Sequence, residues 1–359
     1  MQTMAERIVI PGGALDPHVH FRQPGATHKE DFTTGTRAAL VGGYTAVFDM
    51  PNNPIPTMTP AALDEKRRLA HGNIYIDVGF NYGGTLESSQ TFQLVIDRVR
   101  ALKVYMNPTT GNLLVESDKE LETIFSMWPK KHPIMVHAEG PTFERAINMA
   151  RKTGQRLHLC HMSLASEMQM IIDAKEEGLP VTAEVSAHNL FLTEDDAKHM
   201  PHGMGMVKHP LATEKDRQAL WDNIDAIDII ASDHAPHTKE EKDKFEEGKG
   251  PYGVTGLETT LPLMLTAVNA GWLSMEKLVD MISTKPREIF RLKSDSQTYT
   301  EVILGDRPHV IDAKDLETRA KQTPFDGYMV TGRVANVDLR GVRILREGEI
   351  VGLPQGRVL

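Results

Sequence analysis

Two histidines separated by one residue, His18 and His20, are the first side chains in the sequence whose types and spacing could do chemistry. They close an apolar run that begins at Ala14, and Arg22 follows two residues later. Side chains alternate between the two faces of a β-strand, so His18 and His20 would point the same way. Two imidazoles on one face can ligate a metal ion. Alone, such a pair is more often a polar strand end at the surface. Whether it binds a metal ion therefore depends on whether the rest of the chain supplies further ligands.

Three further ionisable residues end apolar runs far along the chain, and their types could complete a metal site. His137 ends one run, His161 another and Asp233 a third. Singly, a histidine in an apolar run is more often a hydrogen-bonded core residue, and a lone aspartate at a strand end usually caps a turn. If the fold brings them together with His18 and His20, four imidazoles and a carboxylate suit zinc, with manganese or cobalt as substitutes.

Lys103 is unusual among the ionisable residues of these runs, because it lies inside the apolar run 102–106. An ammonium cannot ligate a cation, and a full charge among apolar neighbours is costly. One interpretation is that Lys103 extends outward or pairs with a carboxylate. The other is that it reacts with carbon dioxide to form a carbamate, an anion whose two oxygens could bridge two metals. Composition alone does not choose between them.

A metal pair at these strand ends would give Asp233 a catalytic use as well. Two bound cations lower the pKa of a bound water toward neutrality and so provide a hydroxide nucleophile. Asp233 could hold one metal, take the proton of that water and pass it to a leaving nitrogen.

Arg22, Asn52 and His237 are the candidates for binding a substrate. A guanidinium just past the histidine pair is suited to a bidentate grip on a carboxylate. Taken singly, Arg22 is typical of a surface residue and Asn52, between prolines, of a turn. As a set, the three residues indicate a pocket for an acidic substrate.

Short β-branched runs alternate with longer amphipathic segments along most of the chain. The runs predict strands at residues 14–20, 44–50, 74–80, 101–105, 133–137, 157–161, 181–185 and 227–233, and the segments predict helices at 31–41, 60–71, 87–100, 118–128, 141–153, 163–177, 214–223 and 256–270. Eight such units predict an α/β fold, a parallel (β/α)8 barrel of the TIM type. The alternative is an open doubly wound sheet, which the missing Gly-x-Gly-x-x-Gly turn disfavours. In a barrel the polar strand ends would meet in one ring.

The pattern changes near residue 300 to short β segments separated by turns. We expect residues 1–10 and 301–359 to form a small β appendage, with residues 7–10 pairing with the C-terminal segments, and residues 11–300 to form the barrel. The lysine- and glutamate-rich stretch 238–249 is expected to be a solvated loop or part of a site rim.

Composition excludes several classes of protein. The 359 residues are 40% hydrophobic and 25% charged, which is typical of a globular protein with a sizeable core. No apolar run approaches the length of a membrane span, and the N-terminus has no signal-peptide pattern. A net charge of −9 without a basic stripe argues against nucleic acid as a partner. The single cysteine, Cys160, fits a reducing cytoplasm.

Taken together, the motifs resemble the amidohydrolase superfamily and, within it, the zinc-dependent dihydroorotases, particularly the dihydroorotase domain of the animal multifunctional pyrimidine protein. The resemblance runs from about residue 8 to the C-terminus, with the motifs in the family's order. They are DPHVHFRQPG at 16–25, HKED at 28–31, DMPN at 49–52, KVY at 103–105, VHAE at 136–139, CH at 160–161, ASDHAPH at 231–237 and GLET at 256–259.

The resemblance implies two zinc ions per chain. His18 and His20 with Asp233 would hold one, and His137 and His161 the other, and carboxylated Lys103 would bridge them together with a hydroxide. Arg22, Asn52 and His237 would bind the substrate carboxylate, Thr109 would contact the substrate from a mobile lid at 107–111, and Asp233 would be the general acid and base.

The implied reaction is the reversible cyclisation of N-carbamoyl-L-aspartate to L-dihydroorotate in pyrimidine biosynthesis. Allantoinase and dihydropyrimidinase share the barrel and the metal ligands, but Arg22 and the run 28–31 favour a substrate with a ring carboxylate. Another alternative is an inactive scaffold for aspartate transcarbamoylase, which the complete set of metal ligands disfavours. The resemblance also implies a homodimer that could associate with aspartate transcarbamoylase.

Three places depart from the family pattern or add to it. Thr110 replaces a bulkier lid residue, and Lys208 and Ala212 stand near positions where many relatives have asparagine and arginine. Cys160 and Glu184 could hold a further metal with His18. However, Cys160 precedes His161 directly, and on a regular strand the two would point to opposite faces.

Overall fold

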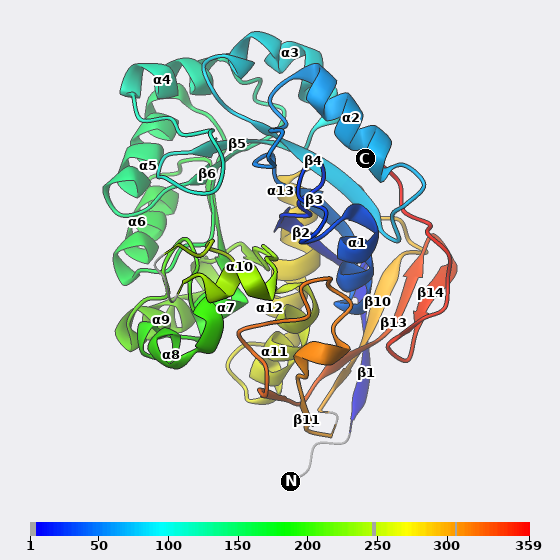
Figure 1. Cartoon of the computed structure of the whole chain (residues 1–359). Helices are drawn as coiled ribbons and strands as arrows, with labels where there is room; N and C mark the ends of the chain where they lie inside the picture. The colour runs from blue at the N-terminus through cyan, green and yellow to red at the C-terminus, as the bar shows by residue number, and fades with distance from the viewer. Residues whose placement is uncertain (1–4, 246–248, 306) are drawn as a thin grey trace.

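Eight parallel strands form the centre of the computed structural model, which describes residues 5–245, 249–305 and 307–359 (Figure 1). They pair in chain order, and an isolated bridge between Val19 and His234 joins the first strand to the segment after the last. The predicted α/β barrel is therefore confirmed. Its strands are β2 (Ala14–Val19), β3 (Tyr44–Asp49), β4 (Asp77–Gly83), β5 (Ala101–Tyr105), β6 (Ile134–His137), β7 (Leu157–Leu159), β8 (Val181–Ser186) and β9 (Ile229–Ala231).

Helices follow the strands and surround them, as Figure 1 shows for α2 to α6. Those that the amphipathic segments predicted are α1 (Phe32–Val41), α2 (Pro60–Ala70), α4 (Asp118–Met127), α5 (Pro141–Thr153), α6 (Ala165–Glu176), α9 (Glu214–Asp222) and α11 (Leu257–Asn269). The hydroxyl of Thr59 accepts a hydrogen bond from the amide of Ala62 and caps α2, whose first residue is Pro60. Proline fits there because the first helical amide needs no partner within the helix.

Several predicted elements were wrong in extent. The segment 87–100 is not one helix but two short 3₁₀ turns, η1 (Ser88–Thr91) and η2 (Ile96–Arg98), on either side of α3 (Phe92–Val95). The stretch 238–249 contains α10 (Lys239–Asp243), and its residues 246–248 lie outside the described residues. Helices that the sequence did not predict are α7 (Ala187–Phe191), α8 (Glu194–His199), α12 (Met275–Val279) and α13 (Lys285–Ile289).

The observed strand β4 begins at Asp77, three residues after the predicted start at residue 74. The end of the chain lies against the segment that was expected to begin the strand. There the amide of Gly356 donates to the carbonyl of Ile74 (2.9 Å), and Val358 bridges to Val78.

An antiparallel sheet from the two ends of the chain lies beside the barrel (Figure 1). The predicted pairing of residues 7–10 is confirmed, because β1 (Glu6–Pro11) pairs with β10 (Tyr299–Leu304). β13 (Arg333–Leu339), β14 (Val342–Arg346) and β15 (Glu349–Ile350) complete this sheet, whereas β11 (His309–Val310) and β12 (Met329–Val330) form a separate pair. β10 begins at Tyr299, before the boundary proposed at residue 301. The division of the chain into domains at residues 10 and 301 stays a prediction.

The C-terminal region also reaches loops that follow the barrel strands. The Glu30 carboxylate accepts hydrogen bonds from the Thr318 hydroxyl and the Arg319 amide, and the Gln322 side-chain amide donates to the His237 carbonyl (2.5 Å). The Glu30 contacts hold the loop after β2, and the Gln322 contact holds the loop after β9, which carries His237. Within the described residues, no helix has the length and apolar character needed to cross a membrane.

Candidate active site

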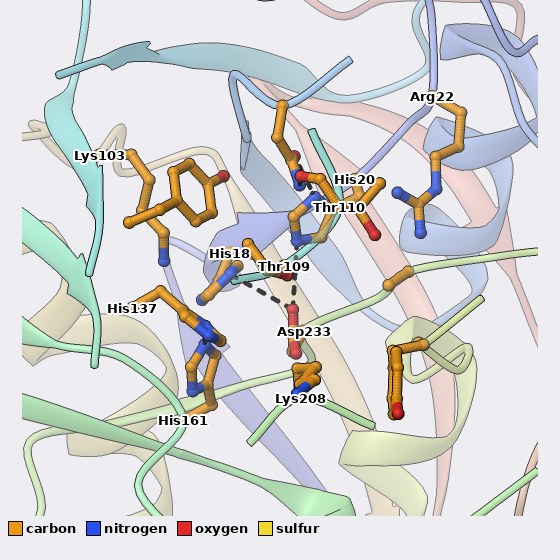
Figure 2. A pocket seen from close by; sticks show the side chains of 15 residues that line it. His18, His20, Arg22, Lys103, Thr109, Thr110, His137, His161, Lys208 and Asp233 are labelled. Atoms are coloured by element: carbon orange, nitrogen blue, oxygen red, sulfur yellow. Dashed lines mark hydrogen bonds and ion pairs between the residues drawn. The ribbon is translucent and has the colours of Figure 1, made fainter. Parts of the chain in front are cut away.

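The histidine pair and Asp233 come together, as Figure 2 shows. They lie at the C-terminal ends of β2 and β9. The Nε2 atoms of His18 and His20 each lie 3.3 Å from Oδ1 of Asp233. The same-side orientation predicted for the two histidines is therefore observed. Two imidazole nitrogens that converge on one carboxylate oxygen form a candidate metal-binding group.

His137 and His161 form a second group next to the first. Nδ1 of His137 lies 3.0 Å from Nε2 of His161, and both side chains are buried. Nε2 of His137 lies 2.9 Å from the Glu139 carboxylate, which would leave Nδ1 as the ligand atom. His18, His161 and Asp233 also present three ligand atoms within 4.8 Å of one another, so the two groups are contiguous.

The electrostatics of the cluster suit a divalent cation. Burial lowers the pKa of His20 to about 3 and lowers the pKa values of His137 and His161, so these imidazoles are neutral. Burial opposes ionisation of Asp233, but His18 and His20 outweigh it and hold the pKa of the carboxyl at about 2. Neutral imidazoles and an ionised carboxylate are the forms that ligate metals. The donor set therefore fits zinc.

Lys103 lies beside the histidines with an incomplete set of partners. Its side chain is buried, and its ammonium contacts the Cys160 thiol (2.9 Å) and the face of the Tyr105 ring. The buried Lys66 provides the comparison, since its ammonium contacts the Asp49 carboxylate, the Met50 carbonyl and the Asn53 side chain, each at 2.7 Å. Among the described residues, no carboxylate lies within ion-pair distance of Lys103. A carbamate at Lys103 would replace this poorly compensated cation by an anion facing the cations of a metal pair.

We expect Lys66→Met to lower the free energy of unfolding by about 3–5 kcal/mol, because it leaves the buried Asp49 carboxylate without its cation. Asp49 also accepts the Phe21 amide (2.8 Å), so the segment after His20 would loosen. Urea denaturation measures the change. Arg68→Met on the same helix removes an exposed ion pair with Glu65 and should change stability by less than about 1 kcal/mol. Equal effects of the two substitutions would contradict this role of Lys66.

Three site residues occupy the left-handed region of backbone conformation that favours glycine. The φ angles are 61° for Arg22, 36° for His161 and 46° for Asp233. Such conformations cost about 1–3 kcal/mol each and persist where the surrounding structure holds them. His161 and Asp233 lie two residues beyond the ends of β7 and β9, so the prediction that these strands run to 161 and 233 was wrong. The turns direct both side chains into the site.

The turn at His161 also removes the objection to a further ligand group. Because β7 ends at Leu159, Cys160 and His161 do not alternate as they would on a regular strand, and both are buried beside the site. His18, Cys160 and Glu184 present ligand atoms within 4.8 Å of one another. Nδ1 of His18 pairs with the Glu184 carboxylate, which also lies 3.0 Å from Nε2 of His158. Glu184 therefore orients His18, and the third metal stays a prediction.

The residues predicted to bind substrate take different positions. Arg22, Asn52 and Thr109 line the same pocket as the metal-ligating cluster. His237 does not line it but lies behind Arg22, with Nε2 3.1 Å from the guanidinium and 2.9 Å from the Tyr252 carbonyl. The Asn52 side chain accepts from Nδ1 of His20 (2.8 Å) and donates to the Thr110 carbonyl (3.1 Å). His237 therefore contacts Arg22, and Asn52 links His20 to the loop 107–111; the substrate-binding roles of these residues stay predictions.

The pocket also contains residues to which sequence reasoning assigned no role. Tyr105, Thr110, Lys208, Ala235, Tyr252 and Gly253 complete its lining. The spacing of Lys103 and Tyr105 on β5 could have indicated Tyr105, because residues two apart on a strand share a face. Its buried hydroxyl has no hydrogen-bond partner among the described residues. Tyr252 and Gly253 follow the charged stretch without a chemical pattern of their own.

The fold and the site define a (β/α)8 barrel with a buried histidine and aspartate metal-binding cluster at the C-terminal ends of its strands. Comparison with known proteins agrees, since the model of the amidohydrolase family matches residues 8–296. The chain belongs to the amidohydrolase family and, within it, groups with the dihydroorotases.

Two relatives and one solved structure indicate the range of similarity. Over 352 residues the chain is 41% identical to the multifunctional protein CAD of Squalus acanthias, covering 98% of this chain but only 15% of that protein. It is 34% identical to the dihydroorotase of Pyrococcus abyssi, covering 98% of this chain and 86% of that enzyme. The L-hydantoinase (dihydropyrimidinase) of Arthrobacter aurescens superposes with a TM-score of 0.91 at 27% sequence identity. The match covers 98% of this chain and 88% of that chain.

Proposed function

We propose that this chain is a dihydroorotase that interconverts N-carbamoyl-L-aspartate and L-dihydroorotate. The observation that carries the proposal is Arg22, a buried guanidinium beside the metal-binding cluster. It donates to the Pro236 carbonyl (3.0 Å) and contacts His237, and among the described residues no carboxylate lies within ion-pair distance of it. Burial lowers its pKa to about 10, so it remains charged at neutral pH. A substrate carboxylate would supply the missing anion.

The metals would be held by His18, His20 and Asp233 on one side and by His137 and His161 on the other, with the carbamate of Lys103 between them. Bound zinc would supply a Lewis acid and an activated water. Asp233 would accept a proton from the attacking water and return it to the departing ring nitrogen. Arg22 would hold the ring carboxylate and so orient the scissile amide.

On substrate binding, the Asn52 side chain would replace its hydrogen bond to the Thr110 carbonyl by a hydrogen bond to the substrate. The pocket that holds the cluster is about 30 Å³ and adjoins a cavity of about 200 Å³, and His20, Arg22, Asn52 and Thr110 line both. Asn52 and Thr110 line both hollows, and the hydrogen bond from Asn52 to the Thr110 carbonyl would open on binding. The freed Asn52 amide would then donate to the substrate carboxylate next to Arg22. Thr109, on the same loop, would move with it.

A second candidate function is hydrolysis of a neutral cyclic amide, since the L-hydantoinase named above has nearly the same fold. Arg22 disfavours this candidate, because a neutral ring leaves the buried guanidinium without an anion. An inactive scaffold for aspartate transcarbamoylase is disfavoured because all six predicted metal-site residues line one pocket. The homodimer, the association with aspartate transcarbamoylase and the cytoplasmic location stay predictions.

The experiment that tests the proposed function offers purified, zinc-loaded protein four rings in parallel: dihydroorotate, dihydrouracil, hydantoin and allantoin. We expect ring opening of dihydroorotate and at most trace activity on the three rings without a carboxylate. Opening of the neutral rings alone would contradict the assignment. Full metal content with no turnover of any ring would support the scaffold.

Arg22→Met should raise KM for dihydroorotate by about 100-fold, because a buried charge-assisted pair contributes roughly 2–3 kcal/mol. Arg22→Lys keeps the charge but loses the planar pair of donors, so we expect an intermediate KM. Steady-state kinetics with dihydroorotate measure both. An unchanged KM in Arg22→Met would show that the carboxylate binds elsewhere.

A further inference from the structure

His237 lies between two cations, and the partners of its ring determine which nitrogen carries the proton. Nδ1 lies 3.1 Å from Nζ of Lys29, whereas Nε2 lies 2.9 Å from the Tyr252 carbonyl oxygen and 3.1 Å from Nη2 of Arg22. Burial, together with the charges of Arg22 and Lys29, lowers the pKa of His237, so the imidazole is neutral. A neutral imidazole has one N–H, and only one of its nitrogens can donate.

Lys29 decides between the two nitrogens, because an ammonium has donors and no acceptor. Its Nζ forms an ion pair with the Glu241 carboxylate at 3.1 Å. Nδ1 of His237 must therefore accept from Lys29, which leaves the proton on Nε2. There the Tyr252 carbonyl, which can only accept, takes the hydrogen bond. Both contacts specify the same tautomer of the imidazole, with the proton on Nε2.

This tautomer leaves Arg22 with a donor that His237 cannot accept. Nη2 of Arg22 lies beside an N–H, and two donors form no hydrogen bond with each other. Nε of the same guanidinium donates to the Pro236 carbonyl (3.0 Å), which holds the group in place at the pocket. We propose that Lys29 is a positioning residue that fixes His237 with its proton on Nε2 and so keeps a donor of Arg22 available for the substrate carboxylate.

This inference rests on the proposed function, and it predicts what the removal of Lys29 does. In Lys29→Met, the Glu241 carboxylate, whose Oε2 lies 3.5 Å from Nδ1 of His237, becomes the partner of that nitrogen. A proton on Nδ1 would donate to Glu241 and Nε2 would accept from Arg22, so two bonds to charged groups would replace the bond to the neutral Tyr252 carbonyl.

The substrate carboxylate would then compete with His237 for the same donor of Arg22. We expect Lys29→Met to raise KM for dihydroorotate by about tenfold, the effect of one hydrogen bond, and to leave kcat within about twofold. Lys29→Arg keeps a charged side chain that can only donate, so its KM should stay within about threefold of the original value. Steady-state kinetics on the zinc-loaded protein measure both variants.

A double-mutant cycle separates an effect through His237 from a direct contact between Lys29 and the substrate, because Lys29 and Arg22 both line the cavity that adjoins the pocket. His237→Phe keeps a flat ring but has no nitrogen that could accept from Arg22. In that background, Lys29→Met should change KM by less than about twofold. An increase of about tenfold in both backgrounds would overturn the proposal.

An exposed lysine on the same rim provides the control for a general loss of positive charge. Lys244 follows α10, and its charge acts on Lys29. Lys244→Met should leave KM for dihydroorotate unchanged, because it does not alter the partners of His237. A rise in KM equal to that of Lys29→Met would assign the effect to the net charge of the rim and would overturn the proposal.

The tautomer itself can be measured without any substrate. In zinc-loaded protein with ¹⁵N-labelled histidine, the resonances of His237 are those that disappear in His237→Phe. The original chain should show a protonated Nε2 and an unprotonated Nδ1, and Lys29→Met should show the proton on Nδ1. The same tautomer in both proteins would overturn the role of Lys29. If the original chain opens no dihydroorotate, the proposed function fails, and the position of the proton still decides the role of Lys29.

Discussion

Replacing Lys103 with alanine should lower kcat/KM for dihydroorotate by at least about 10³-fold, because a bound metal contributes several kcal/mol to stabilising the transition state. Lys103 is buried beside His137, His161 and Cys160, and among the described residues its ammonium has no anionic partner. As a carbamate it would supply the anion between two cations. Without the carbamate, the two metals would lose the ligand that they share.

Metal content and rate must therefore fall together in Lys103→Ala. Elemental analysis of the purified variant should find less than the zinc bound by the original chain. Acetate added to the variant should restore part of the rate, because a small carboxylate can occupy the place of the carbamate. A ¹³C resonance from labelled bicarbonate should be present in the original protein and absent in the variant. Unchanged metal content and rate would rule out the carbamate.

Asp233→Asn is the substitution with the second largest expected effect. We expect kcat to fall by about 10²–10⁴-fold, the range that a positioned general acid and base contributes. The amide keeps the size of the side chain, but it cannot accept and return a proton. Near-normal kcat with full metal content would show that another group transfers the proton.

The position of Asp233 requires a metal measurement beside the kinetics, because its carboxylate oxygen also lies 3.3 Å from both His18 and His20. Zinc content separates loss of a ligand from loss of a proton carrier, and excess zinc in the assay compensates for weaker binding. Asp222→Asn replaces an exposed aspartate on α9 and provides the matched control, with kcat expected to stay within about twofold.

The order of the barrel strands and the residues at their ends could be predicted from the sequence, because both depend on local patterns. His18 lies on β2, His20 directly follows the last residue of that strand, and Asp233 follows an apolar run. The turns beyond β7 and β9 could not be predicted, since a left-handed conformation at His161 or Asp233 depends on surrounding contacts rather than on residue type.

The roles of residues around the metal ligands depend on long-range contacts, which a single sequence does not display. His237 was predicted to bind substrate; its imidazole contacts the Arg22 guanidinium and does not line the pocket, and its part in substrate binding stays a prediction. Lys208 was a departure from a family pattern with no assigned role, and it lines the pocket because Met206 and His209 are anchored by segments distant in sequence. The residue types indicated a metal-binding cluster, whereas packing determined which side chains line the pocket.

The measurement that tests the central proposal most directly is a zinc titration of dihydroorotate ring opening. Protein stripped by a chelator should be inactive, and the rate should return with added zinc and reach its maximum at about two equivalents per chain, as expected for a two-metal site. Full activity of the stripped protein, or no turnover of dihydroorotate at any zinc content, would contradict the assignment of this site as a metal-dependent dihydroorotase centre.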